Sequence, residues 1–261
     1  MELLTRKFIK DNRLNCSREK AIDALCNAKR VGVLTGAGIS AESGIATFRG
    51  EDGLWNKLNP EELAGMSGFL KNPQLVWEWY QYRRNIIENV KPNAAHIALA
   101  EMESFYPEYS ISTQNIDGLH QRAGSQTVFE LHGNILRNRC MECGVTLQDD
   151  HIDEQMGIPK CSCGGLVRPN VVWFGEPLPE SILTTSFEVA RHADVYFSIG
   201  TSAAVYPAAY LPIEALYHGA FVIEINLEPT ELTPLANTSL QGKAGEMLPA
   251  LWQDVKCKVT A

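Results

Sequence analysis

The chain has 261 residues, of which 45% are hydrophobic, so it is long enough to bury a substantial core in one large domain or two small ones. Its formal net charge of -8 at pH 7, with no local stripe of lysine and arginine, argues against a nucleic-acid-binding surface. Since no apolar run approaches the roughly 18 residues that a bilayer span needs, we expect neither nucleic acid nor a membrane as a partner.

The first thirty residues carry no recognisable targeting signal. They lack the apolar centre of a secretory signal, and acidic residues interrupt their basic ones, which a transit peptide avoids. We therefore expect a cytoplasmic protein. Within this stretch, the apolar spacing over residues 17–28 predicts a helix that packs beside the first strand.

A predicted strand followed by a glycine-rich turn comes next. Residues 31–35 are apolar or small, and residues 36–41 read GAGISA, the G-x-G-x-x-A form of a dinucleotide-binding turn. Glycines there permit a close backbone approach, so that free N–H groups can face a pyrophosphate. The same glycines could instead serve only to make a turn, and the second strand with an acidic end that follows in NAD dehydrogenases is missing.

Three helices are predicted after this turn, opening at Pro60, Pro73 and Asn93. Tyr80 and Arg83 lie three residues apart on the second helix and therefore project from one face of it. Spacing alone allows a surface aromatic ring stacked under an arginine. It also allows a phenol and a guanidinium that together bind a carboxylate.

Polar residues follow two further predicted strands. Residues 109–113 lead into residues 114–117, which read QNID, and residues 127–131 lead into His132. Open α/β sheets bind ligands at the carboxyl ends of their strands, and an imidazole is suited to proton transfer near neutral pH. Turn caps would explain the asparagine and the aspartate equally well, and His132 could be structural.

Four of the seven cysteines are clustered in the order Cys140, Cys143, Cys161 and Cys163. This pattern, with an odd total, indicates reduced thiols rather than disulfides, and predicts a closed, structural zinc site over unligated thiols. The second pair is C-x-C where C-x-x-C is commoner, so we expect a tighter turn there.

The last third of the chain alternates between strands and helices in the doubly wound manner. Helices are predicted over residues 181–192, 208–218 and 246–254, and strands over 194–199 and 220–225. Polar residues after these two strands would form a second wall at the edge of the glycine turn, unless they are only caps. The apolar run before them, residues 167–176, predicts a buried strand.

Taken together, the chain resembles the sirtuin family of NAD-dependent protein lysine deacylases, through the motifs GAGIS, AESGI, TFRG, TQNIDGLH, ELHG, RPNVVWFGE, GTSAAVYPAA and INLEPT over roughly residues 31–249. The resemblance implies a Rossmann-like parallel sheet with helices on both faces, plus a small helical and zinc-binding module formed by two insertions. The NAD-binding domain would comprise residues 1–44, 106–133 and 171–261, and the small domain residues 45–105 and 134–170.

The resemblance also implies the reaction and the roles of residues. The amide oxygen of an acyl-lysine substrate would attack the ribose carbon that carries nicotinamide, and His132, as general base, would activate a ribose hydroxyl that captures the acyl group. Asn115 and Asp117 would hold the carboxamide and the ribose, and count with His132 as catalytic. The pairing of Tyr80 with Arg83 most resembles the class that removes succinyl and malonyl groups.

Other site residues are carried over from the matching motifs. The expected NAD-binding residues are Gly36, Ala37, Gly38, Ser40, Ala41, Phe48, Arg49, Gln114, Asn115, Ile116, Asp117, Gly200, Thr201, Ser202, Asn226, Leu227, Glu228 and Ala244. Val172, Trp173, Phe174 and Gly175 would join Tyr80 and Arg83 in binding the substrate. Without the resemblance, Phe48 and Arg49 read as a buried ring and a surface cation.

Two rival functions share the same NAD pocket. One is protein mono-ADP-ribosyl transfer, and the other is a non-catalytic NAD-sensing zinc module. The second is disfavoured because a sensor needs neither His132 nor the pair Asn115 and Asp117. The sequence indicates no oligomeric state.

Overall fold

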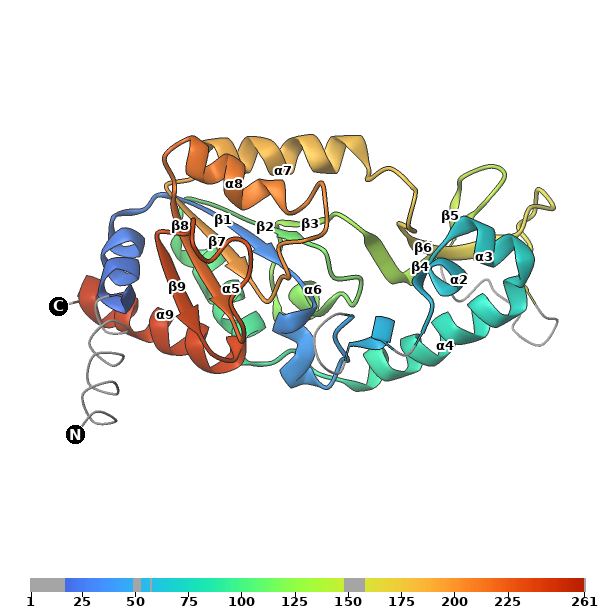
Figure 1. Ribbon diagram of the computed structural model, residues 1–261, viewed down its shortest axis with the longest axis horizontal. Coiled ribbons are helices and arrows are strands. Elements are labelled where there is room, and N and C mark those ends of the chain that lie inside the picture. The colour runs from blue at the N-terminus through green and yellow to red at the C-terminus, as the bar shows by residue number, and fades with distance from the viewer. Residues whose placement is uncertain (1–16, 49–52, 57, 148–157, 261) are drawn as a thin grey trace.

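The computed structural model describes residues 17–48, 53–56, 58–147 and 158–260. Its main body is a six-stranded sheet with helices on both faces (Figure 1). The strands are β1 (Arg30–Thr35), β2 (Glu108–Thr113), β3 (Val128–Glu130), β7 (Val195–Ile199), β8 (Phe221–Asn226) and β9 (Thr238–Gln241). They lie in the order β3-β2-β1-β7-β8-β9, and every neighbouring pair is parallel. The predicted Rossmann-like fold class is confirmed.

Two layers of helices bury the sheet. The helix at residues 17–27, α5 (Ala94–Phe105) and α9 (Ala244–Thr260) cover one face, and α7 (Glu180–His192) and α8 (Tyr210–Tyr217) cover the other. All five residues of β7 are buried, as expected for a parallel strand that is covered on both faces. Across the described residues, no helix combines the length and the apolarity that a bilayer span requires.

A second body lies at the other end of the molecule's long axis (Figure 1). It contains a three-stranded sheet in the order β5-β4-β6, with β4 (Gly133–Cys140), β5 (Thr146–Leu147) and β6 (Val167–Val171). Its helices are α2 (Pro60–Leu63), α3 (Met66–Lys71) and α4 (Pro73–Asn89). The short helix α6 (Leu119–Ala123) contributes Leu119 to the apolar cluster that packs α3 and α4 against β4 and β6. The boundaries of the two predicted domains stay a prediction.

Several elements begin where the sequence predicts them. Asn59 and Asn72 accept hydrogen bonds from the first turns of α2 and α4, each with proline next in the chain. Three strands were not predicted. β4 and β5 have no regular apolar alternation, and the register of β4 against β6 shifts between Gly133 and Asn138. The edge strand β9 is short and mostly polar.

A buried carboxylate in the middle of β8 explains how the chain after that strand is held. Glu224 is 2% exposed and accepts hydrogen bonds from the hydroxyls of Thr230 (2.5 Å), Thr233 (2.6 Å) and Ser239 (2.9 Å). A buried carboxylate needs such donors because desolvation without them is costly. These bonds fix the loop that follows Asn226 and bring β9 to the edge of the sheet.

Asp194 ties the beginning of β1 to the beginning of β7. It accepts from the backbone N–H groups of Lys29 and Arg30 at 2.9 Å each, and from Arg30 Nη2 at 2.6 Å. The hydrogen bond from the Arg30 side chain is the main cause that lowers the pKa of Asp194 to about 2. A carboxyl group with a depressed folded-state pKa stabilises the fold above its unfolded pKa of roughly 3.9, and this stability is lost as the pH falls through the folded-state value.

We therefore expect Asp194→Asn to lower the free energy of unfolding at pH 7 by about 1 kcal/mol, a small value because solvent screens this pair. The difference from the wild type should shrink between about pH 4 and pH 2. Urea unfolding curves over this range measure it, with Asp254→Asn as a control at an exposed ion pair elsewhere. A difference that stays constant with pH would contradict the assignment.

Candidate active site

Three glycines interlock the turn after β1 with the turn after β7. A Cβ atom on Gly36 would lie 2.8 Å from the carbonyl oxygen of Gly200, and one on Gly38 would lie 2.7 Å from the Gly200 Cα. Gly200 itself has a φ of 61°, in the left-handed region that favours glycine. These glycines therefore do permit a close backbone approach, but the backbone that they approach is the turn after β7.

The N–H groups of this turn differ from the expectation. Gly36 N–H donates to the carbonyl of Ile199 (3.0 Å) and Gly38 N–H to that of Gly200 (2.8 Å), so neither is free for a phosphate. The chain then enters a 3-10 helix, η1 (Ala37–Ser43), which contains Ser40 and Ala41. Among the described residues, no hydrogen bond engages the Ala37 N–H.

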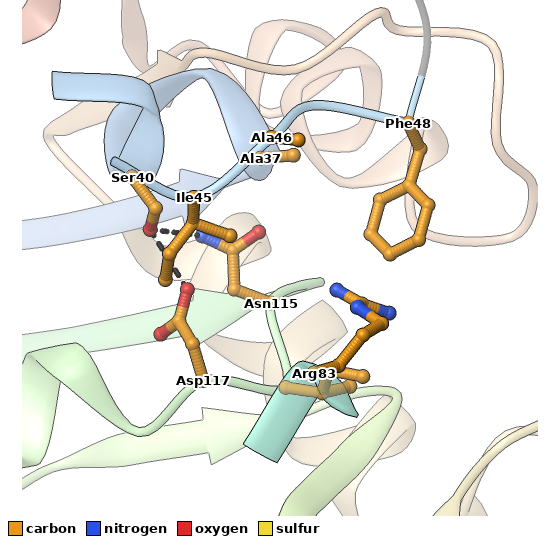
Figure 2. Close-up of a pocket in the computed structure, with 9 residues that line it drawn as sticks. Ala37, Ser40, Ile45, Ala46, Phe48, Arg83, Asn115 and Asp117 are labelled. Atoms are coloured by element: carbon orange, nitrogen blue, oxygen red, sulfur yellow. Dashed lines mark hydrogen bonds between the residues drawn. The ribbon is translucent and has the colours of Figure 1, made fainter. Parts of the chain in front are cut away.

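A pocket opens beside this turn, at the carboxyl ends of β1 and β2 (Figure 2). Its walls come from η1 and the loop after it, from α4, and from the loop after β2. The lining residues are Ala37, Ser40, Ile45, Ala46, Phe48, Arg83, Asn115, Ile116 and Asp117. Six predicted cofactor residues and one predicted substrate residue thus share one space, and Ile45 and Ala46 were not selected from the sequence.

Ser40, Asn115 and Asp117 form a buried polar network in this pocket. The Ser40 hydroxyl donates to Asp117 Oδ2 (2.8 Å), and Asn115 Nδ2 donates to Ser40 Oγ (3.2 Å) and to the carbonyl of Gly36 (3.1 Å). Asp117 Oδ1 also accepts from the Leu119 N–H (2.9 Å). Burial nevertheless raises the pKa of Asp117. These bonds do more than cap a turn, because they fix two polar side chains against the glycine turn.

His96, which the sequence reasoning missed, lies behind this network. Its Nε2 is 3.5 Å from Ser40 Oγ, and its Nδ1 accepts from the Asn93 N–H at 3.3 Å. Burial lowers its pKa to about 4, so the ring is neutral at pH 7. An accepting Nδ1 leaves the proton on Nε2, which can point only toward Ser40. The sequence did contain one indication of His96: it is the last residue of the sequence NAAH, which forms the capping box at the start of α5.

His132 follows β3 and is half-buried. Its Nδ1 is 3.0 Å from the carbonyl oxygen of Gln114, the residue before Asn115. A carbonyl only accepts, so Nδ1 carries the proton and Nε2 keeps a free lone pair. Burial lowers the pKa of His132, which outweighs the opposite effect of the Gln114 carbonyl. The ring is therefore a neutral base at pH 7.

Arg83 and Tyr80 are both buried, so the alternative of a surface pair is wrong. The Arg83 guanidinium lines the pocket and stacks on the rings of Phe48 (4.6 Å) and Trp79 (5.1 Å). No carboxylate in the described ranges forms an ion pair with it, and burial lowers its pKa. The Tyr80 hydroxyl instead accepts from Trp173 Nε1 at 2.9 Å, and burial raises its pKa to about 12. Tyr80 does not line this pocket.

The predicted second wall stands at the carboxyl ends of β7 and β8. Asn226 Nδ2 donates to the carbonyl of Thr201 (2.6 Å) and so joins the two strand ends. Ser202, Leu227 and Glu228 are exposed there, whereas Thr201 and Ala244, the first residue of α9, are buried. Arg49, the remaining predicted cofactor residue, lies outside the described residues.

Most backbone N–H groups of the segment from Val172 to Gly175 already donate hydrogen bonds within the protein. The N–H of Val172 donates to the carbonyl of His132 (2.9 Å), that of Trp173 to Glu176 Oε2 (2.9 Å), and that of Phe174 to the carbonyl of Ala64 (2.8 Å). The Trp173 ring is buried, while Phe174 is 46% exposed. Space beside Gly175 is open. The Trp173 carbonyl also accepts from the Glu176 N–H (3.0 Å), whereas no described hydrogen bond engages the Gly175 N–H. The Gly175 N–H, the other carbonyl groups and the Phe174 side chain are therefore what this segment can offer to a peptide.

The sulfur atoms of the four clustered cysteines lie close enough together to bind one metal ion. Their sulfur atoms all lie within 4.8 Å of one another, with Cys140 Sγ 3.5 Å from Cys163 Sγ and Cys143 Sγ 3.7 Å from Cys161 Sγ. Zinc with Zn–S bonds of about 2.3 Å in a tetrahedron places its sulfurs roughly 3.8 Å apart. The C-x-C half closes through a turn in which Gly164 N–H donates to the Cys161 carbonyl (2.8 Å). The residues therefore fit zinc, with no position open for catalysis.

Comparisons with known proteins agree with this geometry. The Sir2 family profile matches residues 36–207. The NAD-dependent protein deacylase 2 of Pyrobaculum aerophilum is 51% identical over 236 residues, which are 90% of this chain and 94% of that protein. A solved Sir2 homologue in complex with NAD has a TM-score of 0.87 and 46% identity, with 92% of this chain and 94% of that chain covered. A mutant Sir2 homologue in complex with 2′-O-acetyl ADP ribose has a TM-score of 0.88 and 45% identity, with 93% and 98% covered.

Proposed function

The chain belongs to the Sir2 family and is an NAD-dependent protein deacylase, and from this premise we propose that it removes succinyl and malonyl groups, as well as acetyl groups, from lysine side chains. The single observation that carries the acidic preference is the Arg83 guanidinium, which is buried in the pocket and has no anionic partner among the described residues. A buried cation without a partner is costly to the fold. A carboxylate on the acyl group supplies the missing partner.

The donors around Arg83 suit such an anion. An arginine fork offers two parallel N–H groups to a carboxylate. Tyr80 can add a third donor. The Trp173 indole N–H can only donate, so it occupies a lone pair of the Tyr80 oxygen and leaves the phenol proton free for another acceptor. An acetyl group ends in a methyl and carries no distal carboxylate, so it offers these donors no anion. A site meant only for acetyl groups would favour an apolar side chain at position 83.

The roles of the catalytic residues follow from their bonds. When bound, NAD supplies the ribose carbon and the nicotinamide leaving group on which deacylation depends. His132 accepts a ribose hydroxyl proton at Nε2, since its Nδ1 proton is held by the Gln114 carbonyl. Asn115 and Asp117 orient the carboxamide and the ribose, and Ser40 holds both side chains in place. These assignments rest on position and on the family resemblance.

The other binding residues complete this proposal. The turn from Gly36 to Gly38 would lie against the phosphates together with Gly200 and Thr201, and the Ala37 N–H, which no described hydrogen bond engages, would be its donor. Asn226 to Glu228 with Ala244 would lie against the adenosine. The acyl-lysine peptide would lie along Val172 to Gly175, beside the exposed Phe174 side chain and the open space at Gly175. A related Sir2 homologue binds 2′-O-acetyl ADP ribose, which supports an O-acyl-ADP-ribose ester as the product here.

Arg83→Met tests the acyl preference. One charge-assisted hydrogen bond contributes roughly 1.5–3 kcal/mol, so the loss of the guanidinium should lower kcat/KM for a succinyl-lysine peptide by about tenfold to a hundredfold. The same variant should act on the matched acetyl-lysine peptide with a much smaller change, because the acetyl group has no contact with the guanidinium. Tyr80→Phe should show the same selectivity more weakly. Steady-state assays of one peptide with the two acyl groups measure both.

Arg191→Met is the matched control, since Arg191 lies on α7 and pairs with Glu188 and Glu214 at the surface. It should leave both rates unchanged. If Arg83→Met lowers both rates equally, Arg83 is only structural and the acidic-acyl assignment is wrong.

A further inference from the structure

Arg83 lies in the same pocket as the predicted cofactor residues, not in a channel of its own. Figure 2 shows its guanidinium beneath the Phe48 ring, across the pocket from Ser40, with Asn115 and Asp117 on the loop beside it. An anion bound by Arg83 therefore sits next to the place where the ribose is expected. The two binding sites are close enough to be occupied by one molecule.

We propose that this protein binds its acidic products, O-succinyl- or O-malonyl-ADP-ribose, more tightly than O-acetyl-ADP-ribose, because Arg83 holds the carboxylate of the ester while the ADP-ribose remains in the cofactor site. The inference rests on the proposed function. It adds a ligand class to the site, an ADP-ribose ester with a free carboxylate, and it makes release of that ester slow.

The chemistry of deacylation brings the two groups together. Acyl-lysine, NAD and one water would give lysine, nicotinamide and O-acyl-ADP-ribose. The bond between the ribose carbon and nicotinamide would break, and the amide oxygen of the acyl-lysine would take the place of nicotinamide on that carbon, as a hydroxyl in the product. The acyl carbon would leave the lysine nitrogen, which gains two protons, and form an ester bond to a ribose hydroxyl oxygen, while the water oxygen becomes the carbonyl oxygen of the ester. The distal carboxylate takes no part in these bond changes. The group that Arg83 binds on the substrate is thus carried unchanged into the product, now attached to the ADP-ribose.

The product then contacts the protein at two places, through its ADP-ribose in the cofactor site and through its carboxylate at Arg83. Lysine and nicotinamide carry neither group. Linking two weak contacts in one molecule makes the second contact intramolecular and raises the affinity without any new surface. An acetyl ester lacks the second contact and leaves the guanidinium without an anion. The described acid that faces Arg83 is Asp117, and its oxygens are already engaged by Ser40 and by the Leu119 N–H.

Calorimetric titration of the whole chain with ADP-ribose, O-acetyl-ADP-ribose and O-succinyl-ADP-ribose tests the proposal, and it measures binding without turnover. We expect the succinyl ester to bind about tenfold to a hundredfold more tightly than the acetyl ester, from one charge-assisted bond. In Arg83→Met the ratio of the two affinities should fall toward one. Arg83→Lys, which keeps the charge but not the fork, should give an intermediate ratio, and Arg191→Met should keep the wild-type ratio.

Equal affinity of the wild type for the two esters would overturn the inference. If the same protein still removes succinyl groups and loses that activity in Arg83→Met, the proposed function stands alone. Tight, Arg83-dependent binding of the succinyl ester by a protein that removes no succinyl group would uphold the binding site and overturn the proposed function. A ratio that is unchanged in Arg83→Met would overturn the assignment to Arg83.

Discussion

Replacement of His132 by alanine should slow deacylation by about 10²–10⁴-fold, the usual effect of losing a positioned base, while NAD still binds. The structure gives the reason: the Gln114 carbonyl holds the Nδ1 proton, and Nε2 is left with a free lone pair. The one described side-chain bond of His132 is this bond to the Gln114 main chain, and the network of Ser40, Asn115 and Asp117 does not include the ring, so binding should survive. Single-turnover assays measure the rate, and calorimetry with NAD measures the binding.

The pH dependence should follow from the same ring. Burial lowers the pKa of His132 below its ordinary value of roughly 6.5, so the base stays deprotonated at a lower pH than an exposed histidine would. The acid limb of the kcat/KM profile, which reports the free enzyme, should therefore fall below that value. His192→Ala, at an exposed histidine of α7, is the control and should match the wild type. Near-normal turnover in His132→Ala would refute the proposed mechanism.

Loss of the zinc site should have the largest effect on stability. A closed four-thiolate site contributes folding free energy, commonly about 10 kcal/mol or more in small zinc domains. Cys140 ends β4 and lies opposite Val167 of β6 in the antiparallel pair, so the metal holds this sheet together. Cys140→Ala should therefore lower the melting temperature sharply and remove activity with the fold. A strong chelator should do the same slowly.

Metal analysis should find one zinc per wild-type chain. Cys257→Ala, at an exposed cysteine of α9 outside the cluster, should keep both the metal and the melting temperature. A wild-type protein without zinc, or a Cys140→Ala protein that stays folded and active, would remove this site from the account.

Local pattern was enough to place five of the six strands of the main sheet. The apolar strands and the caps at Asn72 and Asn93 are short-range features, and a parallel sheet that is buried on both faces leaves a strong apolar trace. β4 and β9 leave no such trace, because β4 is irregular and polar and β9 depends on the bonds of Glu224 to residues far along the chain. Spacing of the cysteines predicted the metal site, since ligand geometry limits the spacings that work.

The site was harder to predict where it depends on contacts between distant elements. Tyr80 and Arg83 are both buried, but only Arg83 lines the pocket, and Tyr80 is held by Trp173, a partner that no helical period reveals. In the same way, Trp173 is buried between Phe69, whose ring centre is 5.1 Å from its own, and Arg168, which stacks on its ring at 3.2 Å and is held by Glu176. His96 was not selected from the sequence at all, because its place behind Ser40 depends on the packing of α5 against η1. Each case turns on a tertiary contact, which a one-dimensional pattern does not contain.

The interlocked glycines have a consequence for how the protein is made. β1 lies inside the sheet, and its two neighbours come from residues 108–113 and 195–199. A chain that emerges from the ribosome N-terminus first must therefore keep one side of β1 unpaired until β7 has been synthesised. Because Gly200 completes the turn of Gly36 and Gly38, the nucleotide pocket is finished late in translation. A prematurely terminated chain would carry the whole glycine motif without the surface that gives the motif its shape.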